Sequence, residues 1–112
     1  GRVARHMGLY VPSFVLRDRE RLAEYGIVMC AIPLGRDERM AAPVTVQHRG
    51  ALFESSPEEA LEAIAVEVER RIRRMQGVEA IEDEARRTIQ RFLRSQKPRA
   101  ALVHAFAVSI DE

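Results

Sequence analysis

The sequence contains little cysteine and no long apolar run, and these absences exclude several classes of protein. Cys30 is the only cysteine among 112 residues, so an intrachain disulfide is impossible. Because Cys30 lies inside an apolar stretch, we expect a small buried side chain in a reducing compartment. No stretch approaches the roughly 18 apolar residues of a membrane span, and no signal peptide opens the chain. We therefore expect a cytoplasmic protein without a membrane partner.

The sequence also lacks the clustered side chains that catalysis and metal binding require. His48 and His104 have no adjacent histidine or cysteine, whereas a catalytic metal site needs several ligands around an open position. Cys30 and a histidine could form a nucleophile pair, but no orienting residue or glycine-rich oxyanion loop accompanies them. The Gly-x-x-Gly clamp of some RNA-binding modules is missing as well. We expect no catalytic residue, no metal and no cofactor in this chain.

Charge is nearly balanced, but one basic residue type predominates. The formal charge is +1, and every basic residue except Lys97 is arginine. Arginine forks match phosphate oxygens, which is one interpretation of this bias. Biased codon usage explains the same composition. A balanced charge neither attracts nor repels nucleic acid as a whole, so composition does not decide between the two interpretations.

Two apolar segments in the first half predict a pair of strands. Residues 27–34 are apolar on both alternating faces and too short for a typical helix, which is the pattern of a central strand covered on two sides. Residues 44–53 alternate, with Gly50 placed for a bulge or a close backbone approach. The polar loop 35–42 joins the two segments, so we expect an antiparallel hairpin.

Two amphipathic helices and a last strand are predicted next. Ser56 and Pro57 form a strong helix start, after which apolar residues recur every three or four positions. We predict helices over 57–76 and 79–95, and a third strand over 101–110, where large and small residues alternate. The order β-β-α-α-β gives an α+β fold, a two-layer sandwich with a three-stranded sheet and two antiparallel helices on one face.

The sheet face opposite the helices is the first candidate functional surface. We expect the large side chains of residues 101–110 to lie under the helices and the small ones to point to the other face. A bare apolar patch of this kind usually meets another protein surface. We therefore predict self-association or docking through an oligomer interface formed by Met29, Ala31, Val103, Ala105 and Ala107.

A basic surface on the two helices is the alternative. Arginines gather at the end of the first helix and in the second half of the second helix. Positive charge at a helix C-terminus is favourable without any ligand, so the cluster does not require RNA. In this alternative an accessory domain guides RNA through Arg70, Arg71, Arg73, Arg74, Arg86, Arg87 and Arg91.

The residues ahead of the first strand are interpreted separately. Residues 1–7 have no apolar pattern and look like a tag remnant ahead of a start codon. Residues 8–25 are interpreted as a linker or an edge strand, since Pro12 removes a ladder donor. The α+β domain is expected to span residues 26–112.

Several short motifs resemble the C-terminal region of ribonuclease J. Residues 14–19 (Phe-Val-Leu-Arg-Asp-Arg) and 22–28 (Leu-Ala-Glu-Tyr-Gly-Ile-Val) are similar to the family's Val-Leu-Arg-Asp-Arg and Leu-Ser-Glu-Asp-Gly segments. Residues 48–53 are similar to its Ser-Arg-Gly-Phe-Val-Tyr strand, and residues 92–99 to its closing helix and basic turn. The order and spacing of the motifs agree, and the resemblance covers about residues 14–110.

The resemblance implies a non-catalytic C-terminal assembly domain of a bacterial ribonuclease that acts in RNA processing and decay. The family's catalytic core is of the metallo-β-lactamase type with a β-CASP insertion, and it hydrolyses RNA with two metal ions, usually zinc. The core's His-x-His-x-Asp-His motif is absent here, so no catalytic residue is carried over. The implied partners are that core, reached through residues 8–25, further copies of the chain, and RNA as substrate of the whole enzyme.

Overall fold

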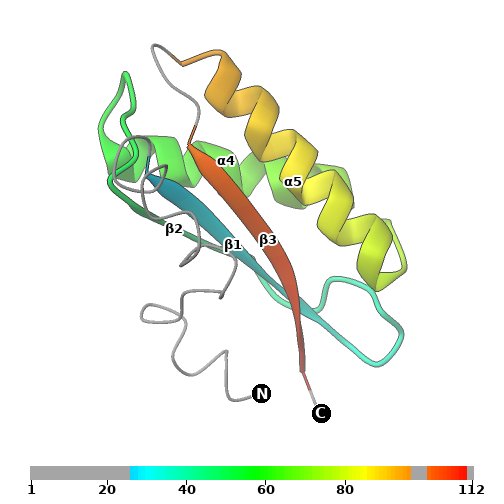
Figure 1. Ribbon diagram of the computed structural model, residues 1–112. Helices are drawn as coiled ribbons and strands as arrows, with labels where there is room; N and C mark the ends of the chain where they lie inside the picture. Colours follow the sequence, from blue (N-terminus) through cyan, green and yellow to red (C-terminus); the bar gives the residue numbers. More distant parts are fainter. Residues whose placement is uncertain (1–25, 97–100, 111–112) are drawn as a thin grey trace.

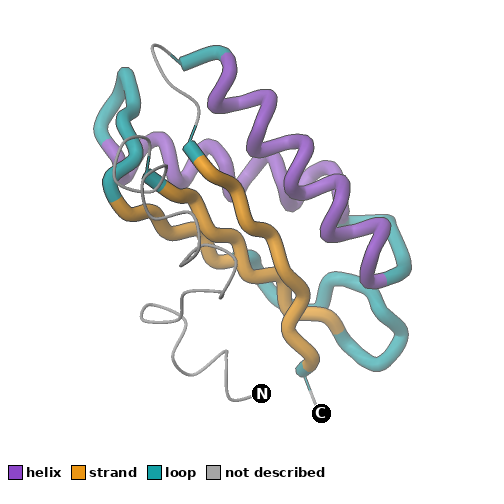
Figure 2. Tube along the Cα trace, in the orientation of Figure 1, coloured by secondary structure: helices purple, strands orange, loops and turns teal. Residues whose placement is uncertain are grey.

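In the described part of the chain, five elements follow one another in the order that the sequence predicts. The computed structural model describes residues 26–96 and 101–110. Its elements are β1 (Ile27–Leu34), β2 (Thr45–Arg49), α4 (Pro57–Ile72), α5 (Val78–Arg94) and β3 (Leu102–Ser109) (Figure 1). Both helices cover the same face of the sheet (Figure 2). The predicted α+β sandwich is confirmed, whereas the predicted tag remnant 1–7 and linker 8–25 lie outside the described residues.

The sheet is mixed, and β1 is its central strand. Its order is β2-β1-β3, with β1 antiparallel to β2 and parallel to β3. β1 is buried along nearly its whole length, as expected for a strand with neighbours on both sides. Pro33 lies beyond Ala31 and Thr45, the last pair that β1 forms with β2. The N–H that proline lacks therefore costs no ladder bond.

The second strand is shorter than predicted because the chain turns at a glycine. β2 ends at Arg49 rather than near residue 53, and Gly50 has φ +70°. At this turn the chain passes directly beside Gly26, where an added Cβ would lie 2.4 Å from backbone atoms of Gly50 and Ala51. The predicted close backbone approach at Gly50 is therefore confirmed, and it ends the strand.

Helix α4 begins where the sequence predicts. Ser56 is the N-cap, and its Oγ accepts a hydrogen bond from Glu59 N at 3.1 Å. The apolar side of the helix faces the sheet, and its buried residues are Ala60, Ile64, Val68 and Ile72. These residues recur every four positions, within the predicted spacing of three or four.

Helix α4 ends earlier than predicted because the next residues bond to the loop between β1 and β2. The helix stops at Ile72, not near Gln76. The Gln76 Nε2 donates to Asp37 O at 2.9 Å, and Gly77 N donates to Glu38 O at 3.0 Å. These long-range bonds replace the continuation of the helix and fasten the loop to the helical layer.

The core lies between the sheet and the two helices. Its largest fully buried aliphatic side chains are Val28 and Ile32 of β1, Ile64, Val68 and Ile72 of α4, and Ile81, Ile89 and Leu93 of α5. Burying one such side chain stabilises the fold by about 1.5–3 kcal/mol. Among the described residues, no helix is long and apolar enough to cross a membrane.

Candidate interaction surfaces

The sheet face opposite α4 and α5, called here the helix-free face, is largely apolar. The strand register places on it Ile27, Met29 and Ala31 of β1, Thr45, Gln47 and Arg49 of β2, and Leu102, His104, Phe106 and Val108 of β3. Leu102 packs against Ile27 and Met29. The β1 side chains on this face are buried, but α4 and α5 do not supply that burial because they lie on the other side (Figure 2).

The predicted orientation of β3 is wrong. Val103, Ala105 and Ala107 pack against the main core under the helices, not on the helix-free face. The register explains this, because β3 runs parallel to β1 with Val103 beside Val28 and Ala105 beside Cys30. Since Val28 and Cys30 belong to the main core, their neighbours on β3 face the helices as well.

Side-chain size gives the physical reason for this orientation. α5 packs over β3 (Figure 1), and small side chains beneath a helix allow it to approach the sheet closely. The larger Leu102 and Phe106 then take the other face. Met29 and Ala31 do lie on the helix-free face. The interface role predicted for all five residues stays a prediction.

The outer edge of β2 carries backbone groups that point away from the sheet. Leu102 N donates to Gly26 O at 3.0 Å, which shows that even-numbered residues of β1 bond to β3. The odd-numbered residues of β1 therefore bond to β2, where Gln47 is the central partner. In an antiparallel strand the alternate residues face outward, so the N–H and C=O groups of Val46 and His48 form the outer edge.

A glutamate from each helix takes one outward N–H group at each edge of the sheet. Glu69 Oε2 of α4 accepts from Val44 N at 2.9 Å, just before β2. Glu82 Oε2 of α5 accepts from Ala107 N at 2.8 Å, within β3. A carboxylate in this place blocks strand pairing. No side chain in the described part of the chain takes the outward N–H groups of β2 itself.

Replacing Glu82 with alanine is expected to lower the free energy of unfolding by about 1–3 kcal/mol, because the half-buried N–H of Ala107 would lose its acceptor. Glu82→Gln keeps an acceptor oxygen and should lose less. Urea unfolding measures both losses, and amide hydrogen exchange at Ala107 reports the bond directly. Equal stability of the wild type and both variants would show that water replaces the carboxylate.

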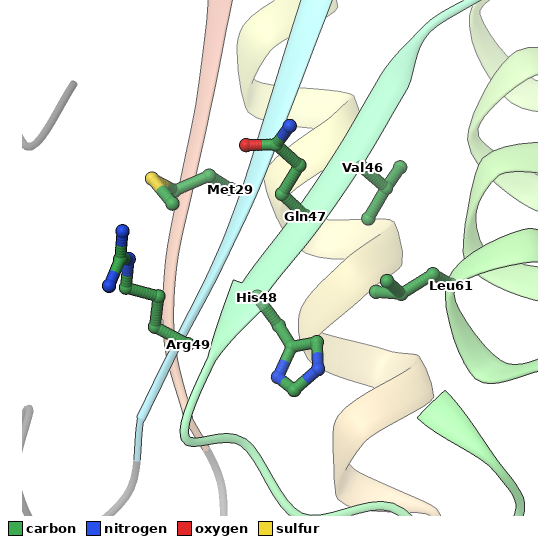
Figure 3. Close-up of a pocket in the computed structure, with 6 residues that line it drawn as sticks. All are labelled: Met29, Val46, Gln47, His48, Arg49 and Leu61. Atoms are coloured by element: carbon green, nitrogen blue, oxygen red, sulfur yellow. The ribbon is translucent and has the colours of Figure 1, made fainter. Parts of the chain in front are cut away.

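A hollow of about 410 Å³ opens at the edge of β2. Its lining residues come from both sides of the strand (Figure 3): Met29, Gln47 and Arg49 lie on one side, and Val46, His48 and Leu61 lie on the other. The hollow therefore lies where the side chains of an added strand would fall, alternately above and below the sheet.

His48 contributes an unusual polar atom to this hollow. Its Nδ1 is buried and has no hydrogen-bond partner among the described residues, whereas buried polar atoms normally have one. The ring meets Phe53 edge-on, with centroids 5.3 Å apart and an interplanar angle of 87°. The contact fixes the ring but does not satisfy its nitrogen. Neither the edge nor the hollow was predicted from the sequence.

Comparison with known families identifies the domain. The profile of the ribonuclease J C-terminal domain matches residues 14–110, which is most of the chain. The chain belongs to this family. The resemblance drawn from the sequence motifs is therefore confirmed, and the chain is an accessory domain of a ribonuclease J. Among curated proteins the comparison finds no match.

Most arginines of the predicted RNA surface of this ribonuclease J domain are paired with carboxylates. The pairs are Arg70 and Arg71 with Glu67, Arg86 with Asp83, and Arg71, Arg87 and Arg91 with Glu84, at 2.7–4.0 Å. The hydrogen bonds from Arg70 and Arg71 lower the pKa of Glu67. Exposed pairs add little stability, but they offset the positive charge. Arg73 and Arg74 have no ion pair within the described residues.

The titratable groups of the ribonuclease J domain do not form a catalytic site in the described residues. Burial, together with the charge of Glu69, raises the pKa of the Cys30 thiol to about 12, so the thiol stays neutral. Burial lowers the pKa of His104, and Glu82 opposes that shift. No group of three or more His, Cys, Asp or Glu side chains there could hold a metal ion.

Cys30 is expected not to react with a thiol reagent in the folded domain at pH 8, and to react fully in urea. The folded-state pKa of about 12 lies above the ordinary 9.0, so the neutral thiol stabilises the fold fully below pH 9. This contribution is lost as the pH rises from 9 toward 12. A Cys30→Ala variant should lack this component. Rapid modification of the native protein at pH 8 would contradict the burial of the thiol.

Proposed function

We propose that the domain is a non-catalytic assembly module of its ribonuclease J, through which copies of the enzyme associate. The observation that carries the proposal is the helix-free face. Its β1 side chains are buried, but Leu102 and Phe106 of β3 are partly exposed on the side that α4 and α5 leave uncovered. Apolar surface of this kind is stabilised when another protein surface covers it.

The proposal places catalysis in another domain of the enzyme. In the full protein, a metallo-β-lactamase core with two zinc ions would cleave RNA in RNA processing and decay. The described residues supply neither a metal-ligand cluster nor an ionised thiol. Their contribution would be to bring cores together and hold them in a fixed arrangement.

Guidance of RNA by the arginines is less well supported. RNA binding requires positive charge that phosphates can reach and neutralise. The carboxylates of Glu67, Asp83 and Glu84 already lie beside five of the seven arginines in question. A labelled single-stranded oligonucleotide, titrated at low and high salt, is expected to bind weakly. Tight binding that falls steeply with salt would favour the RNA-guiding function instead.

Light scattering coupled to size exclusion tests the assembly role. The isolated chain of 12.7 kDa is expected to increase in mean mass as its concentration rises. Leu102→Glu places a charge on the helix-free face and should shift the equilibrium toward the monomer. Val66→Glu adds the same charge at an exposed position of α4 and is the matched control. A wild-type monomer at all concentrations would contradict the proposal, and circular dichroism would verify that each variant folds.

A further inference from the structure

We propose that two copies of this domain pair through the outer edge of β2, in an antiparallel register centred on Gln47. The inference rests on the proposed assembly role and adds a contact at the edge of β2 to the contact proposed for the helix-free face. The partner is a second copy of this chain. The two sheets then continue into each other, and both copies keep their helices on the same side.

The outward backbone groups of β2 are self-complementary. Val46 and His48 face outward and flank Gln47 symmetrically. A two-fold axis at Gln47 places Val46 of one copy opposite His48 of the second copy, and the reverse. Each such pair exchanges both of its N–H···O=C bonds. The outward N–H and C=O groups of Val46 and His48 thereby all gain a partner.

The side chains beside this axis also match. Thr45 of one copy lies opposite Arg49 of the second copy, so no like charges face each other along the strand. On the axis itself, Gln47 meets its own counterpart. An amide has both a donor and an acceptor, so two glutamines can bond to each other. The edge of β2 is therefore compatible with a second copy of itself in charge and in hydrogen bonding.

The flanking residues select this register. Val44 is the next outward residue before β2, but Glu69 already takes its N–H at 2.9 Å. After β2, Gly50 turns the chain with φ +70°. A shifted pairing would have to break the Glu69 bond or extend into the turn. Within the described part of the chain, the segment Thr45–Arg49 is therefore the part of this edge that can pair.

The hollow at this edge provides space for the second strand. A strand added beside β2 places alternate side chains on the two faces of the sheet, and the hollow of about 410 Å³ is lined from both faces. On the helix side, the register brings the two His48 rings diagonally across the axis, within reach of each other. The unpartnered Nδ1 of His48 belongs to this same region.

The other edge of the sheet is less suited to pairing. On β3, Glu82 takes the N–H of Ala107, which lies within the strand. On β2, the corresponding carboxylate acts on Val44, which lies outside the strand. Among the described residues, the block therefore interrupts the edge of β3 but leaves the edge of β2 open.

A charge exchange at Gln47 tests the register. Gln47→Lys places two ammonium groups together at the axis, and Gln47→Glu places two carboxylates there. Each variant alone is expected to raise the dimer dissociation constant by about tenfold or more. An equimolar mixture should recover the mass of the wild-type dimer in light scattering at low salt. Variants that dimerise alone as well as the wild type, or a mixture that does not associate, would overturn the inference.

A proline scan provides an independent test. His48→Pro removes an outward N–H without touching the ladder to β1 and should weaken the dimer. His48→Ala keeps that N–H and should still dimerise, as should Ala105→Pro on the edge of β3. A wild-type monomer would overturn both this inference and the assembly role. A wild-type dimer that His48→Pro and the Gln47 variants do not weaken would overturn the inference alone.

Discussion

Replacing Gly26 with alanine is expected to lower the free energy of unfolding by about 3 kcal/mol or more. Gly26 has φ +79°, and an added Cβ would lie 2.4 Å from Ala51 N and Gly50 C and 2.6 Å from Arg49 O. All three are backbone atoms, so a side-chain rotation cannot relieve the overlap. The chain would have to separate where β1 begins and β2 ends. Urea unfolding followed by circular dichroism measures the loss.

Gly50→Ala is the matched control for this prediction. Gly50 has a similar φ of +70°, but its added Cβ would meet only Gly26 Cα, at 3.6 Å. This is an ordinary contact, so the variant should lose only the cost of a left-handed alanine, about 1–2 kcal/mol. The difference between the variants isolates the steric overlap at Gly26. Equal losses would contradict the close backbone approach.

Replacing Ile89 with alanine is expected to lower the free energy of unfolding by about 2–5 kcal/mol. Ile89 lies in the middle of α5, is fully buried, and belongs to the core between the layers. Truncation removes apolar contacts and leaves a cavity that the helix and sheet can only partly fill. Each lost kcal/mol should lower the melting temperature by about 4–8 °C in a domain of this size, which calorimetry can measure.

Val66→Ala controls for the change in helix composition. Val66 lies on α4 with 54% of its surface exposed, so its truncation removes little buried area. Alanine also has the higher helix propensity, and we expect a change within about 0.5 kcal/mol. A loss at Val66 as large as that at Ile89 would mean that the outer side of α4 is covered in solution, which would itself indicate an association surface.

Local signals in the sequence predict the elements well. The helix start at Ser56 and Pro57 is confirmed because a cap and a proline act within one turn. The continuous apolar run of residues 27–34 identifies the central strand because both of its faces are covered. The ends of elements were predicted less well. β2 stops at the Gly26 contact, and α4 stops where Gln76 bonds to Asp37, and both contacts join distant parts of the chain.

The candidate surfaces depend on long-range contacts more than the helices and strands do. Alternation over residues 101–110 predicts a strand with two different faces but does not say which face meets the helices. The difference in side-chain size indicates the answer. Ala105 and Ala107 are smaller than Leu102 and Phe106, and α5 needs small residues beneath it. The hydrogen bonds that Glu69 and Glu82 accept at the sheet edges had no local signal, because each joins residues 25 positions apart.

The helices, the strands, their order and the family follow from local patterns in the sequence, because periodicity, caps and motifs act over short stretches of chain. Contacts between distant residues fix the rest: which side of β3 faces the core, which arginines are paired, and which edge of the sheet is open among the described residues. A strand pattern repeats every two residues and is the same for either face. The neighbouring strand and the helix above it select between the two, and both are distant in sequence.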